Sequence, residues 1–167
     1  FTKDDDPWHW CAVIAIFFFA LAWHRLGIPS QIYFDETHYV PAARKMLEWA
    51  SHNPEHPLLG KQVLAAAIWL WGDTPLVWRV PSALFGALGL FAFARFIWFT
   101  AGLKQATILA TLLLATDFAW FIQSRIAMLD MVMAGLAMAA LWMCAAAVRL
   151  PHQARWRLAL AGVLFGL

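Results

Sequence analysis

Charged side chains are scarce in this chain. Only 13% of its 167 residues are Asp, Glu, Lys or Arg, and the formal net charge is +2. Soluble domains have about a quarter of their residues charged, whereas here 63% of the residues are hydrophobic and eleven are Trp. The composition predicts a protein embedded in lipid. The small net charge argues against a nucleic-acid-binding surface.

Cysteine is nearly absent as well. Cys11 and Cys144 both lie inside apolar runs, so the sequence offers neither a disulfide framework nor a CxxC pair for a metal. The chain begins at Phe1 and ends within the apolar run AGVLFGL, which we interpret as a piece of a longer membrane protein. No small-residue cleavage site follows the first apolar run, which favours a retained span over a signal peptide.

Long apolar runs are what the chain has in abundance. They predict an all-α integral membrane protein, in which residues 1–167 form the N-terminal part of one multi-span helical bundle. The spans are expected at about residues 8–23, 76–100, 106–122, 131–148 and, cut short, 158–167.

The long polar loop after the first span, residues 24–75, is predicted to carry two interfacial helices, at about 38–50 and 62–71. The second of these is too short to cross, since at about 1.5 Å per residue it covers about half of a ~30 Å hydrocarbon core.

The number of crossings decides which polar residues share a side of the membrane. Two crossings separate Asp35 from Arg125 and Asp130, so these three residues are expected on the same face. The other face receives four basic residues in short loops: Lys104, Arg149, Arg155 and Arg157. By the positive-inside tendency that face is cytoplasmic. We therefore predict an integral protein of the bacterial inner membrane, with Asp35 on the periplasmic or luminal face.

The most concentrated polar stretch is IYFDETHYVPAARKMLEW, residues 32–49. Asp35 and Glu36 could simply begin a surface helix, because acids favour the first helical turn. Pro41 is expected to mark where the acidic turn ends and the interfacial helix begins. The second interpretation is that the two acids belong to a functional site.

The polar residues expected on one face support a site when they are taken together. They comprise the acids Asp35, Glu36 and Asp130, the cations Lys61, Arg79 and Arg125, and His56. Taken singly, His56 could be a solvated loop residue, and Arg125 and Asp130 could belong to a hinge that extends to the water. Jointly, carboxylates beside clustered cations suit an anionic, lipid-linked substrate and a proton acceptor. A channel or symporter would keep its charges near the middle of the membrane.

Four motifs, FDETHY, HPLLGK, WRVPSALFGAL and QSRIAMLD, give the chain a resemblance to a known family. In order and approximate spacing they resemble the protein O-mannosyltransferases, which belong to the phospholipid-carrier-dependent glycosyltransferases with the multi-span C-type (GT-C) fold. The sequence departs at Leu58, where the family pattern HPPLGK has a second Pro.

The resemblance implies a reaction. A sugar, with mannose the first choice, would move with inversion from a polyprenyl or dolichyl phosphate to a hydroxyl of an exported protein. Phosphate is already a good leaving group, so the site needs a carboxylate base and cations rather than a dedicated acid. Two alternatives stay open: transfer of aminoarabinose or another sugar to a lipid acceptor, and a non-catalytic transporter or assembly subunit of the membrane.

The resemblance also implies roles for single residues. Asp35 matches the family's loop aspartate as general base, and Glu36 would orient Asp35 or bind the acceptor. Arg79 matches an arginine at the lipid phosphate. Three further candidates for phosphate or sugar contact are Lys61, His56 and Arg125, with Asp130 as a positioning partner for Arg125. No obligatory metal is expected, although the related aminoarabinose transferases can place a divalent ion near an acid in the position of Glu55.

Overall fold

The computed structural model describes residues 5–50, 56 and 58–167, and every regular element within them is a helix. The elements are α1 (Trp8–Trp23), α2 (Glu36–Leu47), α3 (Leu58–Trp71), α4 (Pro75–Ala101), α5 (Lys104–Ala115), α6 (Phe118–Gln123), α7 (Leu129–Arg149), a 3-10 turn at Pro151–Gln153 and α8 (Ala154–Gly166). The predicted all-α fold is confirmed.

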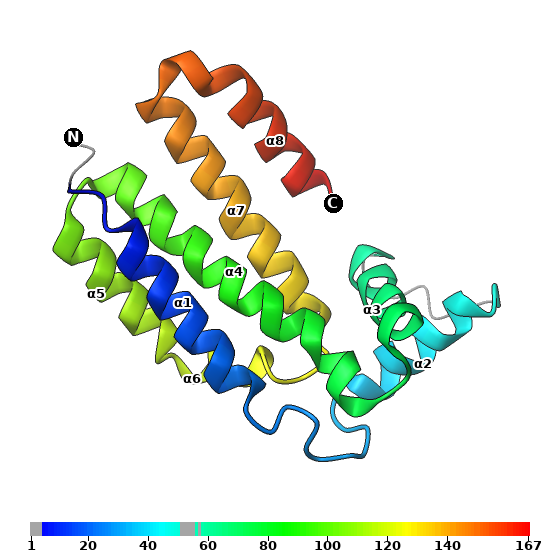
Figure 1. Cartoon of the computed structure of the whole chain (residues 1–167). Coiled ribbons are helices and arrows are strands. Elements are labelled where there is room, and N and C mark those ends of the chain that lie inside the picture. Colours follow the sequence, from blue (N-terminus) through cyan, green and yellow to red (C-terminus); the bar gives the residue numbers. More distant parts are fainter. Residues whose placement is uncertain (1–4, 51–55, 57) are drawn as a thin grey trace.

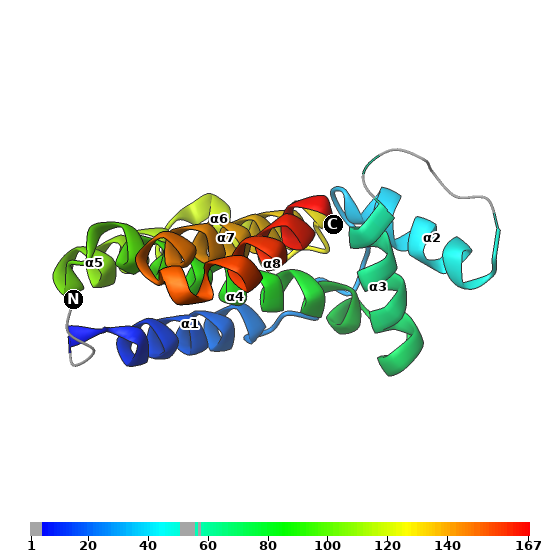
Figure 2. The same cartoon turned by 90° about the horizontal axis from the view of Figure 1, so that it is seen from above.

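Five helices form an elongated bundle, and two lie at one of its ends. Figures 1 and 2 show α1, α4, α5, α7 and α8 side by side, with α2 and α3 beyond the bundle and the N-terminus at the opposite end. We call these the α2–α3 end and the opposite end. Arg149 in α7 donates hydrogen bonds to the carbonyls of Phe99 and Thr100 at the close of α4, which brings two of the basic loops together at the opposite end.

The centre of the bundle is the contact between α4 and α7. A Cβ added at Gly135 would lie 2.8 Å from the carbonyl oxygen of Phe85, and one added at Gly89 would lie 3.0 Å from the Cα of Gly135. The two helices therefore approach backbone to backbone, as small residues allow in membrane bundles.

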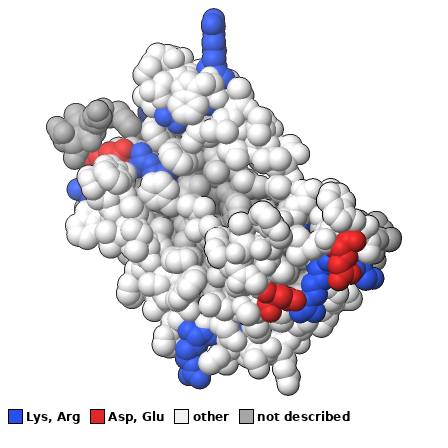
Figure 3. Space-filling view, turned by 45° about the vertical axis from the view of Figure 1, so that its right-hand side comes forward, with Lys and Arg blue, Asp and Glu red and all other residues white. Residues whose placement is uncertain are grey.

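Two of the described helices, α4 and α7, are long and apolar enough to cross a membrane, while α1, α3 and α5 are shorter apolar helices. On the face shown in Figure 3, charged side chains gather toward the ends of the molecule and a broad uncharged surface lies between them. These are the features of a helical bundle in a membrane. That α1, the α5 region and α8 also cross stays a prediction.

The two helices predicted in the first loop are present with shifted bounds. Residues of α2, α3 and α4 share one core cluster, which contains Tyr39, Val40, Leu64, Ile68 and Trp78. The expected role of Pro41 is wrong, because α2 begins at Glu36 and Pro41 lies inside it.

The predicted third span, 106–122, consists of two helices rather than one. α5 ends at Ala115, and Asp117 caps α6 by accepting a hydrogen bond from the backbone N–H of Trp120 at 2.7 Å. An aspartate that bonds to the backbone three residues ahead starts a new helix. The predicted hinge 123–130 is also shorter than expected, because Asp130 already belongs to α7.

Candidate functional site

A buried ion pair joins α2 to α4. Arg79 Nε and Nη2 donate to Glu36 Oε1 and Oε2 at 2.7 and 2.9 Å, and both side chains are fully buried. Such a two-pronged contact is the strongest form of arginine–carboxylate pair. It connects residues 43 positions apart in the sequence.

The remaining donors of Arg79 hold the loop that precedes α2. Nη1 donates to the carbonyls of Leu26 and Pro29, both at 2.9 Å, and Nη2 donates to Gln31 at 3.3 Å. A guanidinium has five N–H groups, and all five have acceptors here. In this structure Arg79 has no donor left for a lipid phosphate, so the assignment of that role gains no support from the geometry.

Glu36 connects a third segment to the same pair. Its Oε1 accepts the backbone N–H of Ala127 at 3.0 Å, and its Oε2 accepts that of Tyr33 at 3.4 Å. The first loop and the 124–128 loop therefore meet at one end of the bundle. That they share one face of the membrane stays a prediction. The carboxylate of Glu36 is buried, and both of its oxygens accept hydrogen bonds from within the protein.

Asp35 differs from Glu36 in both its exposure and its contacts. It is partly exposed, it immediately precedes α2, and its side chain makes no capping hydrogen bond. Within the part of the chain that the structure describes, its carboxylate has no hydrogen-bond or ion-pair partner. Only its carbonyl is engaged, by the N–H groups of His38 and Tyr39.

Arg125 closes the end of α1. Its Nη1 donates to the carbonyls of Leu21, Ala22 and His24 at 2.9–3.1 Å. A cation suits this place, since the last carbonyls of a helix carry partial negative charge. Asp130 lies exposed in the first turn of α7, and among the described residues it forms no ion pair with Arg125. The expected partnership of these two residues is not seen.

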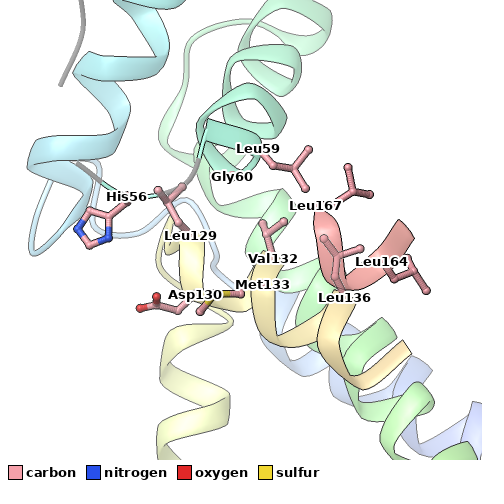
Figure 4. A pocket seen from close by; sticks show the side chains of 10 residues that line it. All are labelled: His56, Leu59, Gly60, Leu129, Asp130, Val132, Met133, Leu136, Leu164 and Leu167. Atoms are coloured by element: carbon pink, nitrogen blue, oxygen red, sulfur yellow. The ribbon is translucent and has the colours of Figure 1, made fainter. Parts of the chain in front are cut away.

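His56 and Asp130 line one pocket, of about 60 Å³, between the starts of α3 and α7 (Figure 4). The polar pair lies on one side of it and leucines from α7 and α8 on the other. The volume is a fraction of the ~300 Å³ at which ligand pockets begin. Lys61 is buried nearby in α3, whereas Glu55, the candidate metal ligand, lies outside the described residues. No metal-binding group of three acids, histidines or cysteines occurs among the described residues.

Sequence reasoning missed Ser82, which is buried in α4. Its Oγ donates to the carbonyl of Met128 at 3.1 Å and accepts the N–H of the same residue at 3.0 Å. A small hydroxyl inside the motif WRVPSALFGAL is the signal that could have revealed it. Ser82 and Glu36 together fix the 124–128 loop, which leads into Asp130.

A second polar network holds α2 against the turn between α3 and α4. Arg44 Nε and Trp78 Nε1 donate to the carboxylate of Asp73 at 2.7 and 2.6 Å. Burial raises the pKa of Asp73, but the hydrogen bonds from Arg44 and Trp78 and the charge of Arg44 outweigh this and bring the pKa below its usual value.

The fold and the site together describe a class of protein: a membrane helical bundle in which the buried Glu36–Arg79 pair lies beside the partly exposed carboxylate of Asp35 at one end. Residues 12–83 match the family model described as dolichyl-phosphate-mannose-protein mannosyltransferase. In sequence the chain is protein O-mannosyltransferase-like, as its motifs predicted.

The names of two curated relatives agree with this family model. A polyprenol-phosphate-mannose–protein mannosyltransferase of Corynebacterium glutamicum is 35% identical over 155 residues, which cover 82% of this chain and 29% of that protein. One from Mycolicibacterium smegmatis is 31% identical over 143 residues, covering 80% and 28%. The chain spans less than a third of the length of these relatives. No solved structure matches it.

Proposed function

We propose that the protein containing this chain transfers mannose from a polyprenyl phosphate to a hydroxyl group of an exported protein, with Asp35 as the general base. The observation that carries the proposal is the contrast between two adjacent acids. The carboxylate of Glu36 is fully hydrogen-bonded within a buried network, and this network fixes the start of α2. The carboxylate of Asp35, at the same place, is partly exposed and has no hydrogen-bond or ion-pair partner among the described residues. The names of the relatives supply the donor and the acceptor class.

In the proposed reaction the acceptor oxygen forms a bond to the anomeric carbon while the bond from that carbon to the phosphate oxygen breaks. The electron pair leaves with the lipid phosphate, and the hydroxyl proton passes to Asp35. Attack opposite the leaving group inverts the anomeric centre. A positioned carboxylate base contributes roughly 10²–10⁴-fold to such a step.

The cations divide into two roles in this proposal. Arg79 is a positioning residue, because each of its five N–H groups is already engaged. Arg125 is partly exposed and uses only Nη1 for the end of α1. The guanidinium also lies over the Phe121 ring, 5.5 Å from its centroid. Its other N–H groups have no hydrogen-bond partner in the described parts of the chain, so Arg125 is the cation we assign to the phosphate or sugar.

The site would face the extracytoplasmic side of the inner membrane. The argument is the excess of Lys and Arg in the short loops of the opposite end, which the positive-inside tendency assigns to the cytoplasm. Acceptor proteins would then meet the site after export.

Asp35→Asn in the full-length protein tests the catalytic assignment. The change removes the charge and keeps the shape, so we expect mannose transfer to a peptide acceptor to fall roughly 10²–10⁴-fold with unchanged thermal stability. Asp117→Asn is the matched control: it alters an exposed acid, and asparagine caps a helix as well as aspartate does. Wild-type transfer by Asp35→Asn would overturn the assignment.

The acceptor class needs a separate measurement. Mass spectrometry of exported proteins and of lipid A, from cells with and without the full-length gene, should show hexose on Ser or Thr that depends on the gene. A gene-dependent aminoarabinose on lipid A, with no change in the proteins, would reject mannosyl transfer to protein.

A further inference from the structure

Two buried residues of α4 hold the segment that connects α6 to α7. Ser82 and Gly86 are four positions apart, so they lie on the same face of the helix. Arg79, three positions before Ser82, continues this row toward the start of α4. The connecting segment comprises residues 124–128 and contains Arg125, the cation assigned to the donor.

Ser82 fixes the end of the segment that leads into α7. Its Oγ donates to the carbonyl of Met128 at 3.1 Å and accepts the N–H of Met128 at 3.0 Å. The same N–H also donates to the carbonyl of Ile126 at 2.7 Å, which closes a tight turn over residues 126–128. Ser82 and Met128 are both buried, so loss of the hydroxyl would remove two hydrogen bonds that lie away from water.

Gly86 fixes the other end, where the segment leaves α6. A Cβ added at Gly86 would overlap Ser124 Oγ and would lie 2.9 Å from Ser124 Cβ, so the segment contacts the α4 backbone directly. Ser124 is completely buried in this contact. The Gly86 carbonyl also accepts the indole N–H of Trp120 at 3.2 Å, which holds α6 at the same place.

Arg125 lies between these two attachments, so its backbone is held on both sides. The segment is also attached to the loop that carries the base, because Glu36 directly follows Asp35 and accepts a backbone N–H of the segment at 3.0 Å. The guanidinium of Arg125 donates to the end of α1. The two α4 residues therefore act on this cation through the backbone of the segment.

We propose that Ser82 and Gly86 are positioning residues for binding of the sugar–phosphate donor, because they hold Arg125 at a fixed place relative to Asp35. This inference rests on the proposed function, which takes Arg125 as the cation for the donor and Asp35 as the base. A binding group is effective when its support is rigid, and a helix is a firmer support than a loop. Here α4 supplies that support for a cation that lies in a loop.

Donor kinetics of the full-length protein test the role of Ser82, with polyprenyl-phosphate mannose and a short Ser-containing peptide as substrates. In Ser82→Ala we expect the donor KM to rise roughly tenfold, since one hydrogen bond changes an equilibrium constant by up to about that factor. The KM of the peptide should change little. A variant that only folded less well would lower the apparent kcat and leave the donor KM unchanged.

Thr111→Val is the matched control for the loss of a buried hydroxyl. Thr111 is completely buried, and its hydroxyl donates to the carbonyl of Thr107 within α5 at 2.7 Å. The midpoint of thermal unfolding in detergent is measured for both variants. Whatever its midpoint, Thr111→Val should keep the donor KM of the wild type.

A change of two residues tests Gly86 independently. Gly86→Ala should raise the donor KM as Ser82→Ala does, because the added methyl group must displace Ser124. Gly86→Ala combined with Ser124→Gly removes the side chain that the methyl group meets, and the next atom, Met131 Cε, is 3.4 Å away. This double variant should return the donor KM to near the wild-type value. If it does not, the role of Gly86 is overturned.

A double-mutant cycle with Arg125→Gln shows whether Ser82 acts through the cation. Arg125→Gln alone should raise the donor KM, and the addition of Ser82→Ala should then raise it no further. Equal factors for Ser82→Ala in both backgrounds would overturn the inference. An unchanged donor KM in Ser82→Ala would do the same.

The outcomes separate this inference from the proposed function. An unchanged donor KM in Arg125→Gln would reject Arg125 as the donor cation and the inference with it, while an inactive Asp35→Asn would still support the base. An active Asp35→Asn would instead overturn the catalytic assignment, and the cycle on Ser82 and Arg125 would still report on the donor site.

Discussion

At the scale of single residues, Arg79 connects more segments of the chain than the other charged residues of the candidate site. Its guanidinium connects α4 to the loop at residues 26–31 and, through Glu36, to α2 and the 124–128 loop. Removal of one partner of a buried ion pair costs about 3–5 kcal/mol. Typical total stabilities are about 5–15 kcal/mol, so loss of this one contact would remove a large share of the total.

Arg79→Lys tests the positioning role. Lysine has three N–H donors and no fork, so it leaves buried acceptors unsatisfied. We expect the full-length protein to lose about 3 kcal/mol of stability, seen as a clearly lower midpoint of thermal unfolding in detergent. Arg155→Lys, at an exposed position of α8, should have the wild-type midpoint. An unchanged midpoint with a raised donor KM would instead return Arg79 to the phosphate.

The two acids show what the sequence could and could not predict at this scale. FDETHY indicated a functional loop, and Asp35 remains the candidate base. The sequence could not separate Asp35 from Glu36, because the difference comes from partners 43 and 91 positions away. Burial of one acid and exposure of the other is a tertiary effect. The contacts of Arg79 and Arg125 were beyond sequence reasoning for the same reason, since their acceptors other than Glu36 are backbone carbonyls far away in the sequence.

At the scale of elements, apolar patterns predicted the long helices well. The expected spans at 76–100 and 131–148 correspond to α4 and α7 within two residues at each end. The errors lie where a single residue, an aspartate or a proline, acts on the local backbone. Asp117 begins a new helix inside an apolar run, and Pro41 is accommodated within α2 because that helix packs in the core with α3 and α4. Apolar periodicity carries no information on either effect.

The attachment of α2 to the α3–α4 turn should depend on pH through Asp73. The pKa of Asp73 is lowered in the folded protein. Ionised Asp73 therefore stabilises the fold at pH values above the ordinary carboxyl pKa near 4, and this contribution is lost as the pH falls through the lower pKa of the folded state. Both Arg44 and Asp73 are more than a third exposed, so the contribution is at most about 1 kcal/mol.

Unfolding midpoints of the wild type and of Asp73→Asn, measured from pH 7 to pH 3, check this expectation. The wild type should be more stable at pH 7, and the difference should shrink as the pH falls below the ordinary carboxyl value near 4. Glu48→Gln, at an exposed position after α2, should follow the wild type throughout. A difference that grew toward low pH would contradict the sign of the pKa shift.

At the scale of the whole molecule, the bundle has two chemically different ends. The α2–α3 end contains Asp35, the Glu36–Arg79 pair and the pocket lined by His56 and Asp130. The opposite end contains the basic residues of the short loops, of which Arg149 binds the close of α4. The separation of the candidate site from the basic loops follows from the order of the apolar runs alone, so it could be predicted from the sequence. The contacts between side chains within each end could not.

The direction of the bundle in the membrane can be measured by cysteine labelling of the full-length protein in cells. With Cys11 and Cys144 replaced by Ala, single cysteines are placed at two exposed positions: His38→Cys at the α2–α3 end and Gln105→Cys at the opposite end. Since Lys and Arg are retained in the cytoplasm, a membrane-impermeant maleimide should label His38→Cys in intact cells. It should label Gln105→Cys only after the inner membrane is permeabilised. The reverse pattern would put Asp35 in the cytoplasm, where an exported acceptor could not reach it.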